Sequence, residues 1–114
     1  MTIVIADDQE RERVWLRELL KASLGQDTAV IEASNGEEAI ELVNLKNPNL
    51  VFLDIEMPIL SGIKAAESIM NSHPKTAVIM LSNHSDEVFV RKLWKVAPPD
   101  GAFGYVLKDS TDQQ

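Results

Sequence analysis

Short apolar runs alternate with longer segments of helical period along this sequence, and no other feature restricts the possible folds as strongly. Each run is three to five residues long, and most are rich in valine and isoleucine. They lack the strict apolar–polar alternation of a strand with one wet face, and continuous apolar runs are typical of strands buried on both faces. The five predicted strands are Ile3 to Ala6, Ala29 to Ile31, Leu50 to Leu53, Ala77 to Leu81 and Phe103 to Leu107.

Four segments of helical period follow the first four runs, and each carries start or stop signals. The predicted helices are Glu10 to Leu24, about Gly36 to Lys46, about Ser61 to Asn71 and about Asp86 to Val96. Gly25 ends the first helix. Candidate N-caps for the other three, in order, are Ser34 or Asn35, Ser61, and Ser85. Prolines follow the ends of these three helices. Strands and helices in strict alternation predict an α/β fold in one domain, residues 1–114, with a parallel sheet covered by helices on both faces.

Composition excludes several classes of function. With 114 residues the chain has room for one core, and 18 acidic against 11 basic residues give a net charge of −7. This balance argues against direct nucleic-acid binding and against an anionic membrane surface. There is no cysteine, so disulfides, thiolate zinc sites and cysteine nucleophiles are excluded, and His73 and His84 are isolated. No apolar run could span a bilayer and the N-terminus does not resemble a signal peptide, so a cytoplasmic protein is expected.

Polar residues stand at the carboxyl ends of four of the five predicted strands. Asp7 and Asp8 follow the first strand, Asp54 the third, Ser82 the fourth and Lys108 the fifth. In an open α/β sheet, ligands bind beyond these ends, so the five side chains are expected at one rim. Three carboxylates there would need an oxygen-preferring cation such as Mg²⁺, while the hydroxyl and the ammonium group could hold phosphoryl oxygens. The predicted chemistry is phosphoryl transfer with an aspartate as nucleophile.

Each of these residues also has a simpler interpretation. An Asp-Asp pair before a helix is commonly cap and turn chemistry, and Asp54 could start a turn before Pro58. Ser82 could be a helix cap, and Lys108 a solvated surface lysine. Their conjunction at four strand ends favours a shared site over independent accidents.

These residues resemble the receiver domains of two-component response regulators, the CheY-like family. The resemblance runs from Thr2 to Lys108, nearly the whole chain, in the family's order. The matching stretches are Ile3 to Asp8, Leu53 to Pro58 with Gly62, Met80 to Ser82, and Gly104 to Lys108. It implies a doubly wound, flavodoxin-like sheet of strand order 2-1-3-4-5 and a role in signal transduction through a phosphorelay.

The resemblance also implies a role for each acidic residue. Asp54 is similar to the phosphoacceptor, which receives a phosphoryl group from a histidine kinase or phosphotransfer protein. Asp8 and Asp54 would ligate Mg²⁺, or another divalent cation such as Mn²⁺, directly. Asp7 would act through water, and the backbone carbonyl of Glu56 would complete the protein ligands.

Three further residues would respond to the phosphoryl group. By the same resemblance, Lys108 would pair with its oxygens and Ser82 would swing to hydrogen-bond it. Tyr105 would then follow inward, although an aromatic residue on a terminal strand is commonly only packing. This coupled shift is expected to change a partner-binding surface on the fourth helix and fifth strand.

One departure from the family concerns the end of the sequence. Members normally continue into a fifth helix that covers one face of the sheet, whereas only Asp109 to Gln114 follow the lysine here. Six polar residues cannot form that helix, so apolar surface from the first, third and fifth strands is expected to be open. Either the sequence stops short of that helix, or a partner chain or a rearranged element covers the face. The hypothesis that follows is a homodimer through this face.

Other departures lie close to the site. The interval from Ser82 to Lys108 is 26 positions, about one helical turn longer than expected, and Pro98-Pro99 predicts an extended connection within it. Asp109 stands where many members have a proline with a cis bond. Glu56, Asn83 and His84 flank the site, where they either tune the phosphoryl lifetime or are solvated loop residues.

The leading interpretation is a signalling receiver that is phosphorylated and dephosphorylated by its own residues, not an enzyme with a diffusible substrate. A pseudo-receiver that binds partners without phosphorylation is the first alternative. The departure at the C-terminal end favours it, whereas the presence of all five polar residues at the strand ends argues against it. An aspartyl-phosphate phosphatase is the second, because Asp54 and Glu56 mimic its carboxylate spacing, but after the wrong strand. A flavodoxin-like cofactor binder is disfavoured because Asp7 and Asp8 would repel a phosphate.

Overall fold

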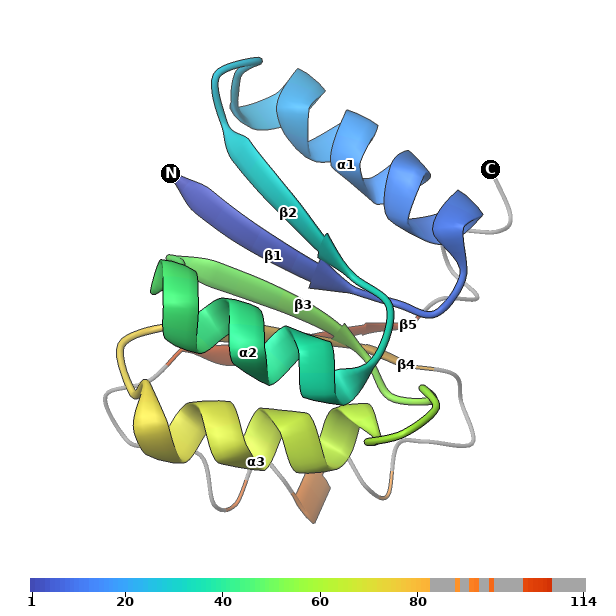
Figure 1. Ribbon diagram of the computed structural model, residues 1–114, viewed down its shortest axis with the longest axis vertical. Helices are drawn as coiled ribbons and strands as arrows, with labels where there is room; N and C mark the ends of the chain where they lie inside the picture. Colours follow the sequence, from blue (N-terminus) through green and yellow to red (C-terminus); the bar gives the residue numbers. More distant parts are fainter. Residues whose placement is uncertain (83–87, 89–90, 93–94, 96–101, 108–114) are drawn as a thin grey trace.

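The computed structural model describes residues 1–82, 88, 91–92, 95 and 102–107, and within them the chain forms a doubly wound α/β sheet. Five parallel strands lie in the order β2-β1-β3-β4-β5 (Figure 1). They are β1 (Thr2–Ala6), β2 (Ala29–Ala33), β3 (Leu50–Asp54), β4 (Ala77–Ser82) and β5 (Phe103–Leu107). The fold class and strand order expected from the sequence are confirmed.

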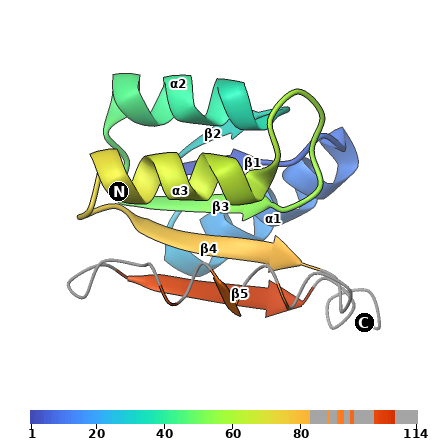
Figure 2. The ribbon, with the colours of Figure 1, turned by 90° about the horizontal axis from the view of Figure 1, so that it is seen from below.

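In the described part of the chain, the three helices with printed bounds cover the sheet unequally. Helices α2 (Gly36–Lys46) and α3 (Gly62–Ser72) lie side by side on one face, and α1 (Glu10–Leu24) lies on the other (Figures 1 and 2). The fourth predicted helix, about Asp86 to Val96, falls largely outside the described residues. Among the described residues, no helix is both long enough and apolar enough to cross a membrane.

The helix ends follow local side-chain chemistry. Gly25 ends α1 with φ = 115°, a left-handed value that glycine adopts without a Cβ clash. The Asn35 side chain accepts a hydrogen bond from the Glu38 N–H at 2.8 Å, so Asn35 rather than Ser34 caps α2. Helix α3 begins at Gly62, one residue later than predicted, because Ser61 is its N-cap and accepts from the Lys64 N–H.

Burial on both faces holds only for β1 and β3. Nearly all of β1 and β3 is buried, as their continuous apolar runs predicted. The expectation is wrong for β4, an interior strand in which buried and partly exposed residues alternate. It is also wrong for β2, where only Ala33 is buried, and for β5, where no residue is. The reason is topological, because β2 and β5 are the edges of the sheet and each has one strand neighbour.

Two hydrophobic clusters lie on opposite faces of the sheet. The larger one joins α2 and α3 to the sheet through residues such as Val43, Leu53 and Ile69. The smaller one consists of Ile3, Ile5, Leu16 and Phe52, beneath α1. The core of the protein is therefore mainly on the α2/α3 face.

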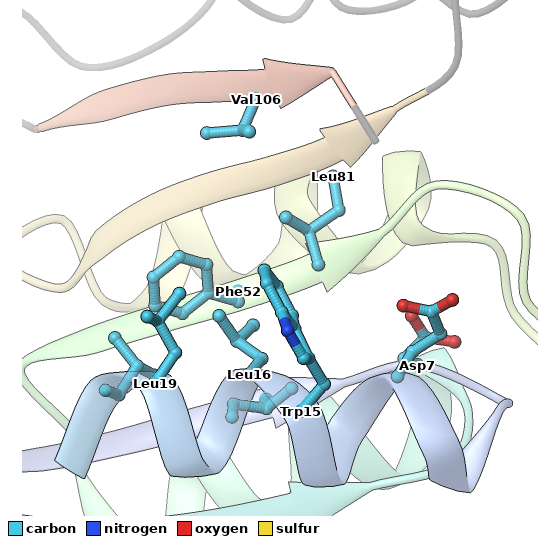
Figure 3. Close-up of a pocket in the computed structure, with 10 residues that line it drawn as sticks. Asp7, Trp15, Leu16, Leu19, Phe52, Leu81 and Val106 are labelled. Atoms are coloured by element: carbon cyan, nitrogen blue, oxygen red, sulfur yellow. The ribbon is translucent and has the colours of Figure 1, made fainter. Parts of the chain in front are cut away.

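An apolar groove opens on the α1 face. Its cavity volume is about 220 Å³, and its lining includes Trp15 and Leu19 of α1, Leu81 of β4 and Val106 of β5. Figure 3 shows the Trp15 ring rising from α1 toward the strands, with Asp7 at one end of the groove. This is the face on which the sequence predicted open apolar surface, while residues 108–114 lie outside the described part of the chain.

Candidate metal centre

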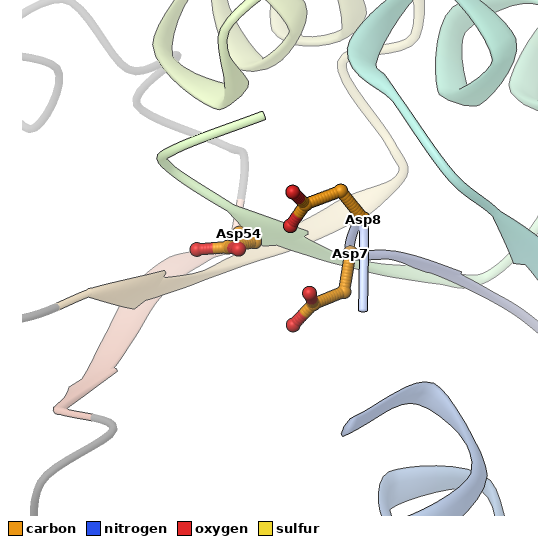
Figure 4. A group of neighbouring side chains, drawn as sticks. All are labelled: Asp7, Asp8 and Asp54. Carbon is orange, nitrogen blue, oxygen red and sulfur yellow. The ribbon is translucent and has the colours of Figure 1, made fainter. Parts of the chain in front are cut away.

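The carboxyl ends of β1 and β3 bring three carboxylates together. The two strands are neighbours with Ala6 opposite Leu53, so Asp7 and Asp8, which follow β1, meet Asp54 at the end of β3. One carboxylate oxygen from each lies within 4.8 Å of the others (Figure 4). The prediction that these three side chains share one rim of the sheet is confirmed.

The donor set fits a hard divalent cation. Asp7 and Asp54 are only 1% and 6% exposed, whereas Asp8 is exposed to solvent. Carboxylates that lie this close together and are partly shielded from water repel one another. This repulsion favours a cation between them. Carboxylates within 4.8 Å of one another could hold such an ion directly or through an intervening water. Side chains on one open edge also leave coordination positions for water or substrate oxygens.

Three hydrogen bonds anchor the turn after β1. The Asp7 N–H donates to the carbonyl of Ala33 at the end of β2, at 3.1 Å. The Asp7 Oδ1 atom accepts from the Gln9 N–H at 3.0 Å, and the Asp7 carbonyl accepts from the guanidinium of Arg13 at 2.8 Å. The backbone of Asp7 is therefore held by both β2 and α1.

Ser82 lies at the end of β4, the strand beside Asp54. It is only 1% exposed, and its hydroxyl has no hydrogen-bond partner among the described residues. A buried hydroxyl without a partner costs about 1–3 kcal/mol. Such a group would bond readily to an oxygen-rich ligand brought to this edge of the sheet.

The loop from β3 to α3 packs tightly against the site. The Gly62 N–H donates to the Ile55 carbonyl at 2.9 Å, and a Cβ on Gly62 would lie 2.0 Å from the Asp54 carbonyl oxygen. Within the loop Ile59 has φ = 69°, and the Leu60 N–H donates to the Pro58 carbonyl across it at 2.7 Å. The sequence indicated Gly62 only through the family resemblance. Its close approach to Asp54 explains why a residue without a Cβ stands there.

The remaining predicted residues are placed only in part. Glu56 is exposed in the loop two residues after Asp54, and Tyr105 on β5 is exposed and stands opposite Met80 of β4. Lys108, Asn83 and His84 lie outside the described residues. Roles as metal ligand, phosphoacceptor or switch stay predictions for every residue of the site.

Sequence reasoning missed a polar link beside the site. Arg13 bonds both the Asp7 carbonyl and the carboxylate of Glu32, and Arg17 pairs with the same carboxylate. Glu32 was overlooked because β2 was predicted to end at Ile31. A charged residue within an otherwise apolar strand, opposite a helix with arginines four residues apart, was the available signal.

Comparison with known sequences identifies a family and its relatives. The family model described as response regulator receiver domain matches residues 3–114. The transcriptional regulatory protein DegU of Brevibacillus brevis is 36% identical over 107 residues, which cover 94% of this chain and 43% of DegU. The nitrate/nitrite response regulator protein NarL of Escherichia coli K12 is 34% identical over 111 residues, covering 95% of this chain and 48% of NarL. The chain spans about half the length of these curated relatives.

A solved structure supports the same assignment. The response regulator protein TrrA of Thermotoga maritima, solved in complex with Mg²⁺ and BeF, is 30% identical to this chain with a TM-score of 0.78. The match covers 98% of this chain and 93% of that structure. The overall arrangement of the described elements is therefore similar to that of a response regulator structure.

Proposed function

The chain belongs to the response regulator receiver domains of two-component systems, and on that premise we propose that it accepts a phosphoryl group on Asp54. The observation that carries the proposal is the cluster of Asp7, Asp8 and Asp54 within 4.8 Å. A histidine kinase or phosphotransfer protein would supply the group.

Asp8 and Asp54 would ligate Mg²⁺ or Mn²⁺ directly, Asp7 through water, and the Glu56 backbone carbonyl would complete the set. The bound cation would neutralise the carboxylates and the phosphoryl oxygens. The acidic cluster supports this assignment, as does the relative crystallised with Mg²⁺ and BeF.

The transfer itself would use residues at the ends of three neighbouring strands. A carboxylate oxygen of Asp54 attacks phosphorus, a P–O bond forms, and the bond from phosphorus to the donor nitrogen breaks. The Ser82 hydroxyl would then donate to a phosphoryl oxygen, and the Lys108 ammonium group would pair with another. No diffusible substrate is turned over, because the product stays on the chain until water hydrolyses it.

We also propose that phosphorylation is transmitted through Ser82 and Tyr105. The buried hydroxyl of Ser82 without a described partner supports a bond that forms only in the phosphorylated state. Movement of Ser82 would make room for Tyr105 and so alter a partner-binding surface near β5. Because the relatives named above are transcriptional or response regulators, control of transcription through a partner region is the output we propose.

One experiment tests phosphorylation directly. The protein is incubated with Mg²⁺ and a small acyl phosphate, and its intact mass is recorded beside Asp54→Asn and a sample without Mg²⁺. Gain of one phosphoryl group that disappears in both controls is expected, because an amide oxygen is a far weaker nucleophile than a carboxylate. A folded protein that gains no mass would instead support the pseudo-receiver.

Two further measurements test the phosphatase alternative and the predicted homodimer. Steady release of inorganic phosphate with many turnovers per protein would favour the aspartyl-phosphate phosphatase. The homodimer predicted through the α1 face would appear in light scattering as twice the 12.7 kDa chain mass, and a monomer at working concentrations would contradict it.

A further inference from the structure

Arg13 links the acidic turn to the second strand. Its Nη1 donates to the Asp7 backbone carbonyl at 2.8 Å, and its Nε donates to Oε1 of Glu32 at 3.0 Å. The Arg13 and Glu32 side chains are 15% and 24% exposed, so water competes only partly for these bonds. The guanidinium thus bridges the turn that carries Asp7 and Asp8 to a carboxylate on β2.

The bond to the Asp7 carbonyl bears directly on Asp8. A peptide unit is planar, so the Asp7 carbonyl and the Asp8 N–H turn together and determine where the Asp8 Cα lies. The Asp8 carboxylate receives no hydrogen bond from the described residues and is exposed. Its position relative to Asp54 is therefore set mainly by the backbone that Arg13 holds.

We propose that Arg13 is a positioning residue for the metal centre and that Glu32 holds its guanidinium in place. This inference rests on the proposed function, because it concerns the divalent cation of that same site. By holding the Asp7 carbonyl, Arg13 keeps the Asp8 carboxylate near Asp54 before the cation arrives. Groups that orient metal ligands without touching the metal commonly change affinity 10- to 100-fold when they are removed.

An effect of charge alone would have the opposite sign. Arg13 is a cation beside a site for cations, so removing its charge would strengthen Mg²⁺ binding if it acted only through the field. Loss of positioning would weaken binding instead. The direction of the change therefore separates the two explanations.

Arg17 provides a matched control. It lies one turn further along α1 and pairs with Glu32 and Glu18, not with the Asp7 carbonyl. Its hydrogen bond to Glu32 raises the pKa of Arg17 above the ordinary value. Arg13 and Arg17 both carry one positive charge, as a guanidinium group always does in proteins. Replacing either arginine with methionine removes one positive charge and one ion pair to Glu32.

The test measures the Kd for Mn²⁺ from the loss of the free-ion EPR signal, and the Kd for Mg²⁺ by competition. The wild-type protein, Arg13→Met and Arg17→Met are compared well below their unfolding midpoints. We expect roughly a tenfold increase in both Kd values for Arg13→Met. For Arg17→Met we expect unchanged or slightly lower values.

The outcomes separate the two proposals. If the wild-type protein binds neither Mn²⁺ nor Mg²⁺, both the proposed metal centre and the positioning role of Arg13 are wrong. A wild-type protein that binds, with Arg13→Met no weaker than Arg17→Met, would overturn the positioning role alone. If Arg13→Met does not fold, Arg13→Lys is compared with Arg17→Lys, because one ammonium group cannot reproduce the fork of Arg13. Equal Kd values in that pair would equally overturn the role.

Discussion

The two faces of the sheet are built differently. On one face α2 and α3 cover the strands, and fully buried residues such as Val43, Leu53 and Ile69 form one continuous cluster. On the other, α1 covers a cluster of four buried residues and leaves a groove of about 220 Å³ beside Trp15. Stability is therefore concentrated on the α2/α3 face, while the α1 face carries the polar link from β2 to the acidic turn.

The helix starts show the same asymmetry. Asn35 and Ser61 cap α2 and α3 with side-chain oxygens, whereas Gln9 precedes α1 without a side-chain cap bond. Arg13, in the first turn of α1, instead bonds the Asp7 carbonyl. The difference indicates that the α2/α3 face mainly stabilises the fold. The α1 face positions the turn that carries Asp7 and Asp8.

Truncating one apolar residue on each face of the sheet tests most directly whether the two faces contribute unequally to stability. Ile69 is 1% exposed and Leu19 is 46% exposed. We expect Ile69→Ala to lower the free energy of unfolding by about 3–4 kcal/mol, because it leaves a cavity in the larger cluster. Leu19→Ala should cost about 1 kcal/mol or less, and urea unfolding followed by circular dichroism measures both. Equal losses would show that the two faces contribute alike.

A second pair compares two glycines. In Gly62→Ala the new Cβ would meet the Asp54 carbonyl oxygen at 2.0 Å, so we expect a loss of roughly 3 kcal/mol. In Gly104→Ala on β5 the Cβ meets no described atom within 4 Å, and stability should change by about 0.5 kcal/mol or less. Thermal unfolding of both variants is the measurement. A Gly62→Ala protein as stable as the wild type would refute the close packing inferred at α3.

Removing the cap of α2 and adding one to α1 would reduce the difference between the helix starts on the two faces. Asn35→Ala removes the oxygen that accepts the Glu38 N–H, and it should cost about 1 kcal/mol. Gln9→Ser supplies the missing cap oxygen to α1 and should stabilise the protein by roughly 0.5–1 kcal/mol. Chemical unfolding midpoints measure the two shifts, and shifts of the same sign would contradict this account.

The smallest effect concerns strain in the loop leading to α3. Ile59 has φ = 69°, a conformation costly for a β-branched residue, and its side chain is exposed. Ile59→Gly relieves that cost, partly offset by the greater freedom of glycine in the unfolded chain, and should stabilise by about 0.5 kcal/mol. Ile59→Ala is the matched control and should gain less, as differential scanning calorimetry can show.

Much of the molecule was predictable from the sequence because its signals are local. Continuous apolar runs identified all five strands, and Gly25 and Ser61 marked helix ends correctly. Acidic residues at strand ends predicted the carboxylate cluster, since parallel strands place these ends at one rim.

The rest depends on contacts between distant segments. Edge exposure of β2 and β5 follows from strand order, which the sequence indicated only through the family resemblance. The link from Arg13 to Glu32 joins residues 19 positions apart, so the sequence shows the two charged residues but not their contact. The close approach of Gly62 to Asp54 likewise requires the loop geometry, which composition alone does not contain.

The strand order also dictates a sequence of events during synthesis. Strand β1 is made before both of its neighbours, yet it lies in the interior of the sheet and pairs with Ala29 to Ala33 on one edge and with Leu50 to Leu53 on the other. At about 5–20 residues per second, β3 leaves the ribosome several seconds after β1. During that interval the edge of β1 that will pair with β3 has no native neighbour, and an unpaired strand edge can pair with other chains.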